Sequence, residues 1–202
     1  MTRRLFLAAG CVALGALAIP HAAGQDLTVA EATSMEKKLA AILERGNRPP
    51  GPQAKPLRTS VTEREVNAYL RFSAQPQMPL GLASPRLAIG DGGGLEARAL
   101  IDLDAIRRSK PRGWLDPLGY ITGSVEVMAA GTLFAANGKG VFHFKSATLG
   151  GLSIPKSLLQ DIVTYYSRTP DHPNGWDLDS PFDLPHNIRQ VDVQRGAATI
   201  VQ

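Results

Sequence analysis

The densest group of side chains that could take part in chemistry lies in one loop near the C-terminal end of the sequence. Within nine residues it offers oxygen and imidazole donors, from Asp171, His172, Asn174, Asp177 and Asp179. The spacing is not that of a calcium loop, which also needs a distal Glu, and no second His stands close by. Asn, Asp, Gly and Pro are equally the residues of ordinary turns. We therefore predict no metal site, and a hydrolase would require these side chains to converge with other polar groups in a pocket.

Other catalytic patterns are weaker. The glycine runs Gly92–Gly94 and Gly150–Gly151 lack the Lys and Ser or Thr of a phosphate-binding loop, and the sequence has no Gly-x-Ser-x-Gly elbow. His143 falls in an expected strand, with its side chain toward solvent. Asp102 and Asp104 would share a strand face about 7 Å apart, but a solvated strand edge explains them better. We expect no catalytic residues, no cofactor and no enzymatic activity.

Basic residues cluster once, between two expected hairpins. Four cations and an aromatic ring lie within a few positions on an expected loop: Arg107, Arg108, Lys110, Arg112 and Trp114. Each Lys or Arg near an anionic membrane surface contributes about 1 kcal/mol of attraction, and Trp prefers the headgroup region. The alternative is a solvated loop whose Trp covers a sheet edge. We predict that these five residues contact a membrane surface or a partner protein.

The first 24 residues have the layout of a secretory signal peptide. Arg3 and Arg4 precede an apolar run from Leu5 to Ile19, and small residues precede an expected cleavage after Gly24. A lipoprotein signal ending at Cys11 is the alternative, but its apolar core would be short. Cleavage after Gly24 would remove the one Cys and lower the formal charge from +4 to +2. We expect a periplasmic or secreted protein that does not bind nucleic acid.

Three helices are expected in the rest of the chain. The capping boxes that start at Thr28 and Thr62 predict helices to about Arg45 and Phe72, and Pro155 opens a third helix to about Arg168. A proline-rich linker over residues 47–56 separates the first two. The expected organisation is a signal peptide over residues 1–24, an N-terminal helix and linker over 25–56, and a single α+β domain over 57–202.

Alternating apolar residues predict long β-hairpins. One hairpin turns at residues 90–94 and continues through 95–104, and a second pairs residues 120–136 with 141–149 across the Asn137-Gly138 turn. A third pairs residues 188–194 with 197–201. The predicted fold class is α+β, with a curved antiparallel sheet of long hairpins packed on two to three helices.

Apolar residues without obvious cover indicate a binding function. The proline-rich stretch over residues 73–85 carries Met78, Leu80 and Leu82, and the second hairpin places Val125 and Val127 among small residues that leave room for a cavity. We predict that these five residues bind a lipid or other amphiphile. The alternative is a structural or assembly partner in the cell envelope, whose first helix docks another protein through Met35, Leu39, Ile42 and Leu43.

Two segments resemble small extracytoplasmic bacterial proteins of the YpmS-like and LmeA-like kind. The segment from Val61 to Leu70 is similar to their Thr-Glu-x-Glu-x-Asn-x-x-Leu helix start, and Phe182 to Ile200 is similar to their closing strands. The resemblance implies an elongated curved sheet wrapped about a helix, similar to tubular lipid-binding domains. It implies lipid binding and no catalytic residues.

Overall fold

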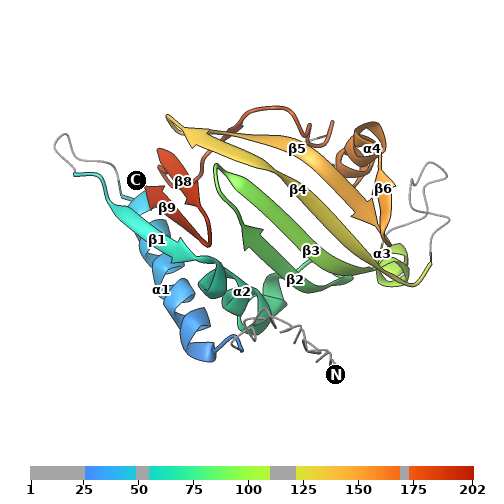
Figure 1. Ribbon diagram of the computed structural model, residues 1–202, viewed down its shortest axis with the longest axis horizontal. Helices are drawn as coiled ribbons and strands as arrows, with labels where there is room; N and C mark the ends of the chain where they lie inside the picture. Colours follow the sequence, from blue (N-terminus) through green and yellow to red (C-terminus); the bar gives the residue numbers. More distant parts are fainter. Residues whose placement is uncertain (1–25, 49–54, 110–121, 169–172) are drawn as a thin grey trace, which may run out of the picture.

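The computed structural model describes residues 26–48, 55–109, 122–168 and 173–202. Within these residues, nine strands form one antiparallel sheet, accompanied by four α-helices (Figure 1). The predicted fold class is therefore confirmed. The expected signal peptide lies outside the described residues, as do Lys110, Arg112 and Trp114 of the basic segment.

The helices begin where the sequence predicts caps. Thr28 and Thr62 each accept a hydrogen bond from the backbone N–H of the Glu three residues later, whose carboxylate accepts the Thr N–H in return. The helices are α1 Val29–Gly46, α2 Glu63–Phe72, α3 Leu103–Ser109 and α4 Lys156–Tyr166, with a 3-10 turn η1 Gln75–Gln77.

The sheet has a long-stranded part and a short-stranded part. Its strands are β1 Arg58–Thr62, β2 Leu82–Ile89, β3 Gly94–Asp102, β4 Ser124–Ala136, β5 Lys139–Leu149, β6 Leu152–Ile154, β7 Phe182–Asp183, β8 Gln190–Gln194 and β9 Ala197–Val201. They run in the order β1-β9-β8-β4-β3-β2, while β5 pairs with the other edge of β4 and carries β6 and β7. Strand β8 meets β4 only at Ala135, beyond the end of β3, so β1, β9 and β8 form a short extension.

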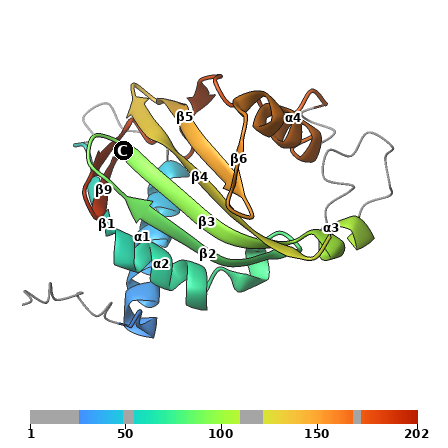
Figure 2. The ribbon, with the colours of Figure 1, turned by 45° about the vertical axis from the view of Figure 1, so that its right-hand side comes forward.

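The helices pack at opposite ends of the sheet. Helices α1 and α2 contact each other and β1, and α2 also contacts β2, whereas α4 contacts β5. Figures 1 and 2 show this separation, with α1 and α2 on the side of β1 and β2 and α4 beside β5 and β6. Most buried apolar side chains accordingly come from α1, α2 and the strand ends, among them Met35, Ile42 and Ile89.

Helix α2 closes the free edge of β2. The Asn67 side chain accepts the N–H of Leu87 at 2.8 Å and donates to its carbonyl at 2.7 Å, and the Glu63 carboxylate accepts the N–H of Ile89 at 2.7 Å. Four helical residues rise about 6 Å and two strand residues about 6.6 Å, so the helix and the strand stay in step. The outward N–H and carbonyl of Leu87 and the N–H of Ile89 are thereby satisfied, which protects this part of the edge strand from pairing with another chain.

Several expected element boundaries are wrong. Leu103 and Asp104 open helix α3 instead of ending the strand, because the Asp102 carboxylate accepts the N–H of Ala105 and starts a helical turn. Arg107 and Arg108 therefore belong to a helix and not to a loop. Helix α2 buries Glu65 and Ala68 most deeply, whereas Val66, Tyr69 and Leu70 are half-buried. Strands β1, β6 and β7 were not expected.

Candidate functional site

One face of the long-stranded sheet is apolar. Residues paired across antiparallel strands share a face, so the strand register defines the two faces of this sheet. On the first face, which we call the apolar face, no described residue that the register pairs is charged, and Lys145 lies unpaired at the bulge between Phe144 and Ser146. It consists of Leu82, Leu87 and Ile89 from β2, Leu95, Ala97, Ala99 and Ile101 from β3, Val125, Val127, Ala129, Gly131 and Leu133 from β4, Phe142, Phe144, Ala147 and Leu149 from β5, and Leu152 and Ile154 from β6.

The centre of the apolar face is lined by small side chains. Ala97, Ala129 and Ala147 follow one another across three strands. The row at one end joins Leu82, Ile101 and Val125, and bulky residues also occupy the other end. There the Phe142 ring lies against Gly131, so closely that a Cβ atom on this glycine would overlap the ring. The apolar face is therefore shallow in the middle and raised at both ends.

The described residues do not seal the middle of this face. Strand β3 is hydrogen-bonded on both sides, yet none of its nine residues is buried, and Ala97 is exposed. The face is closed at the end of β2, where Ile89 is 5% exposed, and the row of alanines is closed on β5, where Ala147 is 1% exposed. At the β6 edge Leu152 is 76% exposed. An apolar surface left open between two covered ends is the usual property of a binding surface.

The structure brings three of the five predicted ligand-binding residues together. Leu82 and Val125 occupy one row with Ile101, and Val127 lies two residues further along β4 on the same face. Met78 and Leu80 precede this row in the chain, where Met78 is half-buried and Leu80 is 63% exposed. Sequence reasoning missed Ala97 and Ala99 as site residues, although the alternation in β3 was the signal that places them on this face.

The basic segment starts at the same end of the sheet. Leu103 is buried at the start of α3 and donates its N–H to the Gly123 carbonyl, while Asp104 accepts the Gly123 N–H at 3.0 Å. These bonds fix α3 beside the first residues of β4. Arg108 is exposed, but the side chain of Arg107 lies outside the described residues with the rest of the segment.

The other candidates for chemistry are engaged in structural bonds. Asp179 pairs with Lys156 at 2.6 Å, and Asp177 accepts the N–H of Asp179 at 2.9 Å. Asp171 and His172 lie outside the described residues. His143 packs its ring 5.2 Å from that of Phe134. No group of three or more His, Cys, Asp or Glu side chains suited to a metal ion occurs among the described residues.

A buried ion pair joins the first two helices. The Glu65 carboxylate accepts hydrogen bonds from Lys38 at 2.7 Å and Ser34 at 2.6 Å, besides closing the cap at Thr62. Burial alone would raise the pKa of Glu65, but these donors outweigh burial and lower it to about 2. Beside it, the guanidinium of Arg64 and the Thr28 cap lower the pKa of Glu31 to about 2.

Comparisons of the chain with protein-family models, with curated proteins and with solved structures found no match. In the part of the chain that the structure describes, no helix is both long enough and apolar enough to span a membrane.

Proposed function

We propose that this chain is an exported, non-enzymatic protein of the cell envelope that binds a lipid or other amphiphile along the apolar face. The observation that carries the proposal is strand β3, which is paired on both sides and lacks any buried residue. A central strand with an apolar side normally packs that side under a helix or a second sheet. The described residues cover this face only near its ends, and a bound acyl chain would complete the cover.

The dimensions of the face suit one acyl chain. From Ile101 to Leu95 the apolar side of β3 extends about 20 Å, given the rise of an antiparallel strand. An acyl chain spans half of a bilayer core that is about 30 Å thick, or about 15 Å. Each buried methylene contributes about 0.8 kcal/mol, so an acyl chain of ordinary length supplies enough free energy for binding.

A matched pair of variants tests this function. Ala97 and Ala83 are both exposed alanines of the β2–β3 hairpin, but Ala97 lies on the apolar face and Ala83, which pairs with Leu100, on the opposite one. We expect Ala97→Asp to abolish the binding of a fluorescent fatty acid and Ala83→Asp to leave it unchanged. Lipid extracted from protein purified from its native host should be detectable by mass spectrometry, and its absence together with equal behaviour of the two variants would overturn the proposal.

The alternative function, docking of another protein through α1, has less support. Met35 and Ile42 of the predicted docking surface are buried within the chain's own fold, and only Leu43 is well exposed. The Lys38–Glu65 pair also holds α1 on α2. A Leu43→Asp variant that lost capture of an envelope partner while keeping fatty-acid binding would favour the alternative.

A further inference from the structure

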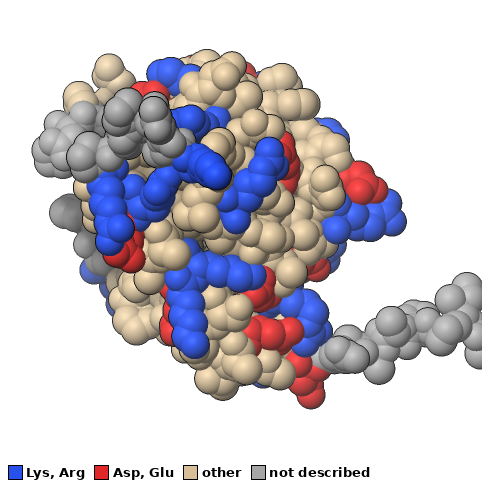
Figure 3. Space-filling view, turned by 90° about the vertical axis from the view of Figure 1, so that its left-hand side faces the viewer, with Lys and Arg blue, Asp and Glu red and all other residues tan. Residues whose placement is uncertain are grey.

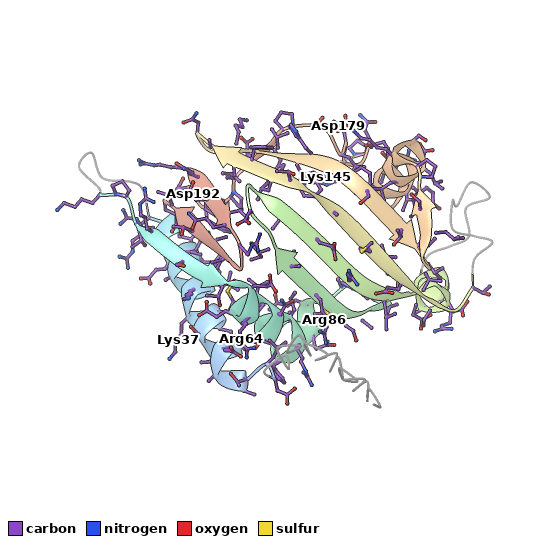
Figure 4. All side chains as sticks on the ribbon, in the orientation of Figure 1. Lys37, Arg64, Arg86, Lys145, Asp179 and Asp192 are labelled. Atoms are coloured by element: carbon purple, nitrogen blue, oxygen red, sulfur yellow. The ribbon has the colours of Figure 1, made fainter. Side chains whose placement is uncertain are left out.

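A cleft that differs chemically from the apolar face lies between α2 and the β2–β3 hairpin. Its volume is about 550 Å³, within the range of small-molecule sites. Four arginines line it, with three acidic residues, an Asn and three apolar residues: Arg64, Arg71, Arg86, Arg98, Asp26, Glu63, Glu96, Asn67, Leu27, Leu87 and Ala88. Figure 4 shows Arg64 and Arg86 beside α2 and β2, away from the labelled Lys145, Asp179 and Asp192.

The arginines converge because two elements are held in register. Arg64, Asn67 and Arg71 recur at helical spacing on one side of α2, and Asn67 fixes that side to the β2 edge at Leu87. Arg71 follows one turn later, toward the part of β2 that carries Arg86. The same bonds that seal the sheet edge thus bring the helix arginines to the strand arginines.

Arg86 and Arg98 are like charges that face each other in the cleft. They are directly opposite each other on β2 and β3, where paired Cβ atoms lie about 5 Å apart. Like charges in this position destabilise a sheet. Such a pair is retained at low cost when an anion lies between the two guanidinium groups, since Arg binds carboxylate and phosphate in a bidentate fashion.

The acidic residues of the cleft do not neutralise all four arginines. Glu96 pairs with Arg98 at 2.7 Å, and Arg64 pairs with Glu31 at 2.6 Å. The Glu63 carboxylate accepts the N–H of Ile89. The Arg86 side chain forms no hydrogen bond or ion pair with any described residue. The Arg71 guanidinium lies 5.2 Å from the ring of Phe72 without a carboxylate partner among the described residues.

We propose that this cleft binds a phosphate group between Arg71, Arg86 and Arg98. The site does not rest on the amphiphile-binding proposal, because Arg86 and Arg98 lie on the face opposite to the apolar face. Two sources share this chemistry, namely a small soluble phosphate and the headgroup of an anionic phospholipid. The end of the molecule formed by β1, β8 and β9 also carries Lys and Arg, but there they lie beside Asp and Glu (Figure 3).

The test compares Arg86→Gln with Arg189→Gln, which removes an exposed arginine outside the cleft. Inorganic phosphate should bind the wild-type protein saturably in calorimetry and raise its Tm, as a ligand of the folded state does. Arg86→Gln should weaken this binding about tenfold or more, as expected for a charge-assisted bond, and Arg189→Gln should leave it unchanged. Without phosphate, Arg86→Gln should unfold at the same temperature as wild type or higher, because it relieves the Arg86–Arg98 repulsion.

Vesicles of phosphatidylcholine with and without phosphatidylglycerol distinguish the two sources. If wild type and Arg189→Gln bind the vesicles that contain phosphatidylglycerol and Arg86→Gln does not, the cleft takes a lipid headgroup. If wild type binds inorganic phosphate saturably but binds neither kind of vesicle, the cleft takes a soluble phosphate. Equal losses in both arginine variants would show diffuse surface attraction and overturn the proposal. So would the absence of saturable binding to either probe. Ala97→Asp should leave phosphate binding unchanged, which separates this result from failure of the apolar-face proposal.

Discussion

The contact between Glu65 and Lys38 predicts a large, pH-dependent share of the stability of the fold. The two side chains are 11% and 29% exposed, so solvent screens the pair only weakly. Replacing Glu65 by Gln removes the charge while keeping the side-chain size, and it leaves Lys38 and Ser34 without their ionic acceptor. We expect Glu65→Gln to loosen α1 from α2.

The lowered pKa of Glu65 sets the magnitude. A fall from 4.5 to about 2 corresponds to about 3 kcal/mol of stabilisation of the folded state. Because the folded-state pKa is the lower one, this stabilisation is fully present above about pH 4.5 and is lost as the pH falls toward 2. For a chain of this length, 1 kcal/mol shifts Tm by about 2–4 °C, so the loss at pH 7 should be about 6–12 °C.

Thermal unfolding followed by circular dichroism at pH 7 and pH 2 measures this effect. The difference in Tm between wild type and Glu65→Gln should be large at pH 7 and should nearly vanish at pH 2. Glu36→Gln, at an exposed position of α1, is the matched control and should unfold as wild type does. In combination with Lys38→Met, the effects of the two changes should be strongly non-additive. An equal Tm difference at both pH values would refute the argument.

Two further predictions concern the sheet. Asn67→Ala should cost about 1–3 kcal/mol, since it leaves the Leu87 N–H and carbonyl without partners, and hydrogen exchange should show faster exchange at the Leu87 amide; unchanged exchange there would contradict the edge-sealing role of α2. Gly131→Ala should destabilise by about 1–3 kcal/mol in urea unfolding, because the new Cβ overlaps the Phe142 ring, and Phe142→Leu in the same chain should restore part of the loss. Equal stability of Gly131→Ala and wild type would show that the ring does not lie against this glycine.

Local signals in the sequence predicted most of the fold. Both capping boxes start helices at the expected residues, and the Asn137-Gly138 turn has positive φ at both positions, as a type I′ turn requires. Strand β1 could not be predicted in the same way, because Val61 is its only strongly apolar residue and its pairing with β9 joins distant parts of the chain. The start of α3 was missed because one carboxylate, that of Asp102, ends the strand.

The two candidate sites differ in how far the sequence could reveal them. Alternation identified Val125 and Val127, and Leu82 was identified as an apolar residue of the proline-rich stretch, before the structure placed the three on one face. Their exposure could not be predicted, because it depends on where the helices pack. The pairing of Arg86 with Arg98 follows in unbroken register from Ile89 and Leu95 at the turn. The position of Arg71 near them depends on the docking of α2 on the β2 edge, which no local pattern indicates.

The central claim is that an amphiphile lies along the apolar face of β3 and β4. Photo-crosslinking with a diazirine-labelled fatty acid, followed by peptide mass spectrometry, locates the bound chain directly. Labelled positions should include Ala97, Ala99 and Val127, and an excess of unlabelled fatty acid should suppress the labelling. Labelling confined to Leu100 and Met128, which lie on the opposite face, or labelling that competitor does not suppress, would contradict the claim.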